Sequence, residues 1–253
     1  MNCSRSRLIK FLAWPLLTLS ANSILAEGNE LSEFSAYYQA NTNGMRGSAE
    51  RHLIKQADNH FRLNISLEAK MARINIGDLE QSSEFSIADN TIIPHNYSYL
   101  VTGITTESQT VSFNWDAEIA LSTEDEQSWS IDLETGTLDQ LSYQAALALQ
   151  LKNEEQAELQ EFEFQLVDGA EIETHKYRIL GTEELETPLG VLNATKLERV
   201  REEDNGRQTL IWFANDWDYL LARIEQINPS GLRIELELEN ALVGGEQVTP
   251  LIN

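Results

Sequence analysis

Cysteine is almost absent from this chain of 253 residues, in which Cys3 is the single example. Cys3 precedes a short apolar stretch at the N-terminus, whereas the cysteine of a lipid anchor would follow such a stretch at the cleavage point. If the N-terminus is removed on export, as argued below, no thiol remains. The sequence then excludes disulfides, thiolate metal sites and a cysteine nucleophile.

Basic residues are also scarce. The chain has 18 Lys and Arg residues against 41 Asp and Glu residues, a formal net charge of −23. A surface of this charge repels the phosphates of nucleic acids and anionic lipid headgroups, so we expect no nucleic-acid partner. It would favour basic partners or divalent cations, but simple solubility is the better account of it.

Long apolar runs are missing as well. Phe11–Leu19 is mostly apolar but too short to span a bilayer, and it lies between three basic residues and a small, polar stretch. That is the three-part pattern of a secretory signal peptide. We predict a signal peptide over 1–26, cleaved after Ala26 or alternatively after Ala21, and no stable membrane span afterwards. Export without disulfides favours a bacterial periplasm.

What the chain does have is strand periodicity. Phe61, Leu63, Ile65 and Leu67 alternate with polar residues, the pattern of a strand with one solvated face. Pro94 predicts an edge or loop at the start of another strand. Further strand patterns cover 31–40, 111–115, 129–133, 162–166, 171–180, 191–201, 207–214, 220–227 and 232–239, and turn signals lie at Asp168-Gly169, Thr187–Gly190, 204–206 and 229–231.

These patterns predict a mainly β protein. We expect a large curved antiparallel sheet, or a barrel or half-barrel, of about a dozen strands. A single domain should cover 27–243, followed by a flexible tail over 244–253.

One principal helix is predicted at about 138–151. Thr137 is the expected N-cap, and Gln140 would complete a capping box with it. Apolar residues recur at helical spacing and should form a stripe against the sheet. Asp139 and Ser142 share a face of this helix. They would form either a polar pair at the mouth of a site or, as we favour, a first-turn capping arrangement.

No catalytic motif is present. The chain has no G-x-S-x-G, H-E-x-x-H, glycine-rich phosphate loop or EF-hand loop, and 41 acidic residues make a chance carboxylate pair the expected outcome. The four histidines, His52, His60, His95 and His175, show no metal-site spacing. We therefore predict no catalytic residue, no metal site and no cofactor, and we favour a protein that is not an enzyme.

The strand Thr209–Ala214 is apolar on both faces, since Ile211 and Phe213 alternate with Leu210 and Trp212. The second face needs cover from the helix, another sheet or a ligand, and packing within the protein is the favoured account. If a ligand provides the cover, the candidate ligand-binding residues are Trp212, Leu210, Tyr219, Tyr99 and Trp115.

Several segments together suggest a family. They are FSAYYQANTNGMRG from Phe34, LDQLS from Leu138, GTEELETPLGVLNATKLERV from Gly181 and RQTLIWFANDWDYLLARIEQ from Arg207. This pattern resembles the DUF3108 family of exported bacterial proteins of unassigned function. The chain departs from it at Leu221, where the family commonly has proline. The resemblance implies no catalytic residue.

Three functions compete at this point. The leading hypothesis is a periplasmic, non-enzymatic binding or carrier-type protein that holds an apolar or amphiphilic envelope ligand in a β-lined cavity. The alternative is a structural or interaction protein of the cell envelope that docks a partner protein by a strand edge or its acidic surface. A carboxylate-dependent envelope hydrolase is the weakest of the three.

Overall fold

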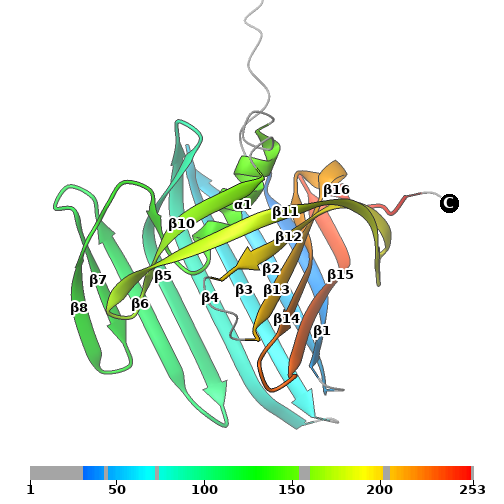
Figure 1. Ribbon diagram of the computed structural model, residues 1–253, viewed down its shortest axis with the longest axis horizontal. Helices are drawn as coiled ribbons and strands as arrows, with labels where there is room; N and C mark the ends of the chain where they lie inside the picture. The colour runs from blue at the N-terminus through cyan, green and yellow to red at the C-terminus, as the bar shows by residue number, and fades with distance from the viewer. Residues whose placement is uncertain (1–30, 43–44, 72–73, 154–159, 202–205, 252–253) are drawn as a thin grey trace, which may run out of the picture.

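The computed structural model describes residues 31–42, 45–71, 74–153, 160–201 and 206–251 (Figure 1). The predicted signal peptide lies outside these ranges, as does most of the turn predicted at 204–206. The described chain contains an α-helix, α1 (Ser142–Lys152), and a short 3-10 helix, η1 (Asn215–Trp217). Its strands are β1 (Phe34–Thr42), β2 (Met45–Ala57), β3 (His60–Met71), β4 (Ile74–Ala88), β5 (Thr91–Gly103), β6 (Glu107–Asn114), β7 (Ile119–Glu124), β8 (Gln127–Asp132), β9 (Thr137–Leu138), β10 (Glu161–Asp168), β11 (Glu171–Thr187), β12 (Gly190–Val200), β13 (Gln208–Ala214), β14 (Leu220–Ile227), β15 (Arg233–Val243) and β16 (Glu246–Gln247).

All of these strands join one sheet. Its order is β8-β7-β6-β5-β4-β3-β2-β1-β15-β14-β13-β12-β11-β10-β9, with β16 paired to β15. Neighbouring strands are antiparallel except β9 and β10, which are parallel. The sheet curves strongly but does not close, because β8 and β9 remain its two edges (Figure 1).

The mainly β, antiparallel fold with one helix is confirmed. The strands outnumber the predicted dozen partly because β9 and β16 have two residues each, too few for an alternating pattern. The turns predicted at Asp168-Gly169 and Thr187–Gly190 connect β10 to β11 and β11 to β12. Gly169 has φ 55°, the left-handed conformation that a tight hairpin requires.

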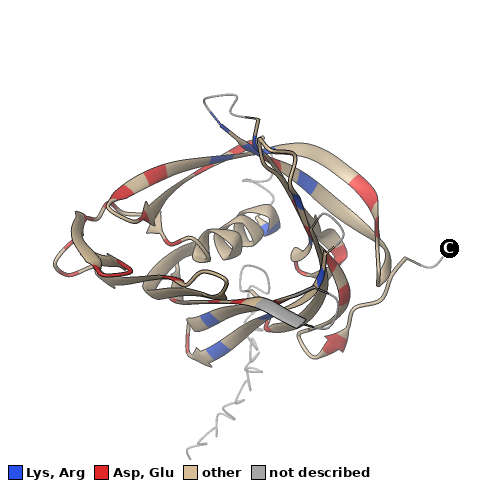
Figure 2. Cartoon of the chain, turned by 90° about the horizontal axis from the view of Figure 1, so that it is seen from below, with Lys and Arg blue, Asp and Glu red and all other residues tan. Residues whose placement is uncertain are grey.

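Helix α1 lies inside the curve of the sheet (Figure 2). It was expected to bury one apolar stripe, but its buried side chains occur all around it, which is typical of a helix enclosed by protein. Among the described residues, no helix has both the length and the apolar character needed to cross a membrane. The buried residues of α1 are Ser142, Ala145, Ala146, Leu147, Ala148, Leu149 and Leu151.

The predicted cap of this helix is wrong. Thr137 belongs to β9, and its buried hydroxyl has no hydrogen-bond partner in the described structure. Asp139 takes the capping role instead, because its Oδ1 accepts hydrogen bonds from the backbone N–H groups of Leu141 (2.8 Å) and Ser142 (2.7 Å). The Ser142 hydroxyl accepts in turn from the N–H of Asp139 (3.1 Å). This reciprocal pair starts the helix at Ser142 rather than at 138.

Two buried clusters fill the interior. The first core surrounds α1, and its largest fully buried members are Phe61, Phe85, Leu63, Leu141, Leu147, Leu149, Leu166, Tyr177, Leu197 and Phe213. The second core contains Ala36, Tyr38, Ala49, Leu185, Leu192, Ala194, Trp212, Ala214, Leu220, Ala222, Leu238, Ala241, Val243 and Val248. Strands β12, β13 and β14 contribute to both clusters.

Alternate residues of these strands therefore face different cores. On β13, Phe213 belongs to the first core and Trp212 to the second, and on β14 the same is true of Leu221 and Ala222. The doubly apolar pattern of Thr209–Ala214 thus reflects a strand with protein on each side.

Pro94 was expected at an edge or in a loop, and it lies near the start of β5, where β5 pairs with β4 but β6 pairs only from Asn96 onward. This part of β5 is therefore an edge, as predicted, and a residue that has no N–H to donate is tolerated there. The pairing register of β4 with β5 also shifts between Glu84 and Phe85, so that Phe85 lies opposite Pro94.

The segment expected to be a flexible tail continues the fold as far as Leu251. Its β16 pairs with β15, and Val248 is buried in the second core. The N–H of Leu251 donates to the carbonyl of Val191 (2.8 Å). One buried valine among polar residues is too weak a pattern to predict this packing.

Candidate functional site

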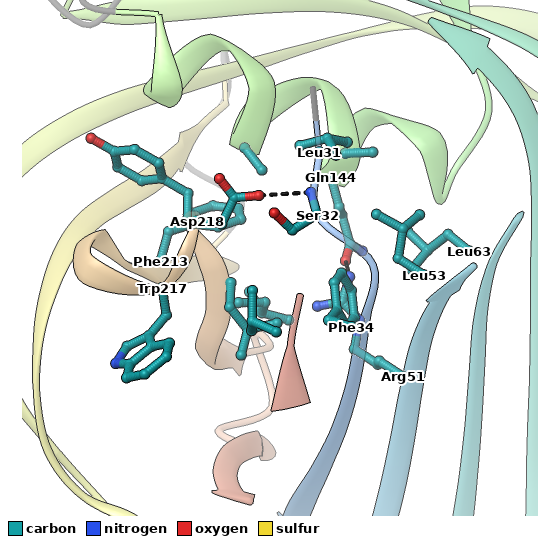
Figure 3. Close-up of a pocket in the computed structure, with 16 residues that line it drawn as sticks. Leu31, Ser32, Phe34, Arg51, Leu53, Leu63, Gln144, Phe213, Trp217 and Asp218 are labelled. Atoms are coloured by element: carbon teal, nitrogen blue, oxygen red, sulfur yellow. Dashed lines mark hydrogen bonds between the residues drawn. The ribbon is translucent and has the colours of Figure 1, made fainter. Parts of the chain in front are cut away.

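A small pocket lies between α1, the start of the described chain and the connection from η1 to β14 (Figure 3). Its volume is about 30 Å³, enough for one or two water molecules. Arg51, Gln144 and Asp218 are its charged and amide groups. The rest of the lining is largely apolar: Leu31, Phe34, Leu53, Leu63, Ala145, Ala148, Phe213, Trp217, Tyr219, Leu220, Leu221 and Val243, with Ser32 beside them.

Asp218 holds one side of this pocket in place. Its Oδ2 accepts a hydrogen bond from the backbone N–H of Ser32 (2.8 Å, Figure 3), and its Oδ1 forms an ion pair with Lys152 at the end of α1. Asp218 and Tyr219 both have left-handed backbones, with φ of 55° and 52°. Such conformations cost roughly 1–2 kcal/mol for each non-glycine residue. The connection from η1 to β14 thus forms this wall, with a strained backbone that the Asp218 carboxylate holds in place.

Arg51 is the exceptional residue of the pocket. It is 3% exposed, and its Nη2 donates to the side-chain oxygen of Gln144 (2.8 Å). Its Nε and Nη1 have no hydrogen-bond partner, and no acidic side chain in the described ranges forms an ion pair with it. The ring of Phe34 lies 5.9 Å from the guanidinium carbon. A buried charge without a counter-ion is costly, so this residue needs an explanation other than stability.

The positive charge of Arg51 affects the pKa of the neighbouring Tyr38 hydroxyl. Burial raises the pKa of the Tyr38 hydroxyl, and Arg51 opposes that shift through its charge and through a side-chain hydrogen bond, since both favour the ionised form. The Tyr38 hydroxyl donates its proton to the carbonyl of Leu221 (2.8 Å). Tyr38 therefore provides no negative charge to Arg51.

Replacing Arg51 by methionine should leave the free energy of unfolding unchanged or raise it by about 1–2 kcal/mol, since an apolar side chain of similar length removes an unpaired buried charge. Urea unfolding of the two proteins, followed by tryptophan fluorescence, measures the difference. A clear loss of stability in Arg51→Met would contradict this account and make Arg51 a structural residue.

A larger groove of about 410 Å³ lies elsewhere, lined by Gln140, Asp168, Glu173, Thr174, His175, Lys176, Arg199, Val200, Arg201 and Arg207. Glu173 contacts both Arg199 (3.7 Å) and the Nε2 of His175 (3.1 Å), and the four basic side chains of the groove outnumber its two carboxylates. Burial, with help from Arg199, lowers the pKa of His175 to about 4, which leaves it neutral at pH 7. We take the smaller pocket beneath α1 as the candidate site, because it combines a largely apolar lining with a buried arginine whose Nε and Nη1 have no hydrogen-bond partner.

The five predicted ligand-binding residues do not gather in one place. Trp212 lies in the second core, and Leu210 packs against that core. Tyr219, Tyr99 and Trp115 pack against the first core, and only Tyr219 lines the pocket of Figure 3. Trp115 donates its indole N–H to the carbonyl of Pro94 (2.7 Å).

Other polar residues singled out in the sequence have structural surroundings. Asp139 and Ser142 are fully buried at the start of α1, where they form the favoured capping arrangement, and neither lines the pocket of Figure 3. The rings of His60 and His95 lie 5.3 Å apart. Within the ranges that the structure covers, no three His, Cys, Asp or Glu side chains form a group that could hold a metal ion.

Arg51 was missed by the sequence reasoning, although a signal for it exists. Ala49, Arg51 and Leu53 share one face of β2, and the first and last of these are apolar. A charge at an inward position between two apolar residues is the kind of local inconsistency that marks functional sites. The weak periodicity of 48–56 concealed it.

Comparison with known proteins adds the family and the fold. No curated protein matches the chain. The solved β-barrel-like protein of the DUF1849 domain of unknown function from Brucella abortus is similar, with a TM-score of 0.56 and 8% identity over 85% of this chain and 98% of that chain. A Bacteroides fragilis protein with a YmcC-like fold is less similar, with a TM-score of 0.36 and 10% identity over 85% of this chain and 97% of that chain. MucB has a TM-score of 0.33 and 12% identity over 89% of this chain and 57% of that chain.

The first of these likenesses shows the fold alone, because its identity is so low. The family assignment has a separate basis. The model of the protein of unknown function DUF3108 matches residues 33–237, which include every strand from β1 to β14 and the first part of β15. The resemblance seen in the sequence is thereby confirmed, and this chain belongs to the DUF3108 family.

Proposed function

We propose that this is an exported, non-enzymatic binding or carrier-type protein of the bacterial periplasm, which holds an apolar or amphiphilic envelope ligand in the pocket beneath α1. The observation that carries the proposal is an incompletely filled apolar pocket that contains a buried, unpaired Arg51. Ligand sites are concave and mostly apolar, with a few convergent polar groups. The signal-peptide pattern of residues 1–26 supports export.

The size of the pocket implies movement on binding. A space for one or two water molecules does not admit a chain of many carbons. Trp217 and Tyr219 line the pocket and are partly exposed, and they belong to the strained connection that Asp218 fastens. Displacement of this connection would enlarge the pocket without disturbing a strand of the sheet.

Filling the pocket from α1 tests the proposal. Ala148 lines it, so Ala148→Leu should weaken the binding of dodecanol, a neutral amphiphile, at least tenfold. Ala117→Leu, in an exposed turn after β6, is the matched control and should bind as the parent protein does. Isothermal calorimetry on the mature chain, purified without detergent, measures each affinity. If Ala148→Leu binds dodecanol as well as the parent does, the site lies elsewhere.

A further inference from the structure

We propose that Arg51 binds the anionic headgroup of the ligand, so that the protein takes an amphiphile with a carboxylate or phosphate head and an apolar chain. This inference rests on the proposed function and names the class of ligand for the same pocket. Neutral amphiphiles should bind there less tightly than anionic ones of equal chain length.

The unused donors of Arg51 carry the first step. A guanidinium group offers five N–H donors in a planar fork, and this geometry matches the oxygens of carboxylate and phosphate groups. Nη2 donates to Gln144 and the guanidinium also interacts with the Tyr38 hydroxyl, while Nε and Nη1 are buried without a hydrogen-bond partner. An anion that reached the pocket would therefore meet N–H donors that are already positioned and make no hydrogen bond to the protein.

No group within the described structure replaces that anion. The carboxylate of Asp218 lines the same pocket, but it already accepts from Ser32 and pairs with Lys152. A water molecule in the pocket could accept hydrogen bonds from Arg51 but would leave its charge uncompensated. A ligand with a negative charge satisfies both requirements.

The apolar wall carries the second step. Leu53 follows Arg51 on the same face of β2, and Leu63 and Phe213 line the pocket beside them. A headgroup on Arg51 would place the chain of the ligand against these side chains. The net charge of −23 repels anions from the outer surface, so capture of an anionic amphiphile must depend on a local buried cation.

Four compounds separate the contributions of head and chain: dodecanoate, dodecyl phosphate, dodecanol and inorganic phosphate. The mature protein at pH 8 should bind dodecanoate or dodecyl phosphate at least tenfold more tightly than dodecanol, and inorganic phosphate far more weakly than either. Arg51→Met should abolish the preference of the protein for the two anionic amphiphiles over dodecanol. The control Arg62→Met, on the neighbouring strand β3, removes an arginine that pairs with Glu84 and should change nothing in these affinities.

Each contrary result has a distinct meaning. Equal binding of dodecanoate, dodecyl phosphate and dodecanol by the parent protein would overturn the headgroup inference and leave the proposed function standing. A preference for anions that survives in Arg51→Met would overturn the role of Arg51. Tight binding of inorganic phosphate that Arg51→Met abolishes would show a site for a free anion and overturn the amphiphile. Failure of all three chain-bearing compounds to bind would remove the proposed function itself.

Discussion

Replacing Asp139 by alanine is expected to lower the free energy of unfolding by about 3–5 kcal/mol. Asp139 is fully buried and accepts three hydrogen bonds from other residues: from the hydroxyl of Ser83 on β4 (2.7 Å) and from the N–H groups of Leu141 and Ser142. Alanine would leave these donors buried without acceptors, at about 1–3 kcal/mol each. Urea denaturation of the mature protein measures the loss.

Asparagine at this position is the matched control. Its amide oxygen can accept from both helix N–H groups, and its amide nitrogen can donate to the Ser83 hydroxyl, which rotates to accept. Asp139→Asn should therefore lose only about 1 kcal/mol. An equal loss in both variants would show that the hydrogen bonds at the start of α1 are not what stabilises it.

The pH dependence of the same pair isolates the carboxyl group. Burial raises the pKa of Asp139, despite the hydrogen bonds that oppose the shift. A folded-state pKa above the unfolded value of about 4 means that its stabilising contribution is complete below pH 4 and is lost as pH rises through the folded pKa. The stability of the parent protein relative to Asp139→Asn should thus fall from pH 4 towards pH 8. All other carboxyl groups are common to both proteins, and a constant difference would contradict the shift.

The start of α1 shows why local sequence could not decide the cap. Thr137 and Gln140 have capping-box spacing, and so do Asp139 and Ser142 two residues later. The pairing of β9 with β10 and the hydroxyl of Ser83, 56 residues before Asp139, decide between them. Neither contact appears in a local window.

The sheet was predictable for the opposite reason. Alternation along β3 and hairpin turns such as Asp168-Gly169 are local features, and together they determine antiparallel neighbours. The pairing of β1 with β15 joins segments that lie some two hundred residues apart, for example Gln39 with Glu237. It leaves no local signal, yet it shapes the second core. The sequence therefore indicated that the Trp212 face of β13 needs cover but not what provides it.

Trp212 distinguishes the two explanations of what covers that face of β13, which are packing within the protein and a bound ligand. It is 4% exposed, and its indole N–H donates to Glu183 (2.7 Å). Its ring lies between Lys196 (4.9 Å) and Arg223 (5.2 Å), its cross-strand neighbours on β12 and β14. These contacts leave the ring no free surface for a ligand. Trp212→Ala should lower the free energy of unfolding by about 3–5 kcal/mol.

Trp212 and Trp217 should differ in the opposite sense in ligand binding: the variant that loses more stability should lose less affinity. At a temperature where the variant remains folded, Trp212→Ala should bind dodecanol as the parent protein does, because Trp212 does not line the pocket beneath α1. Trp217 lines that pocket and is partly exposed, so Trp217→Ala should cost under about 1.5 kcal/mol of stability but alter dodecanol affinity severalfold. Calorimetric titration of both variants provides the comparison. If Trp212→Ala lost binding and Trp217→Ala kept it, the ligand would have to bind in the second core beside Trp212 rather than beside Trp217.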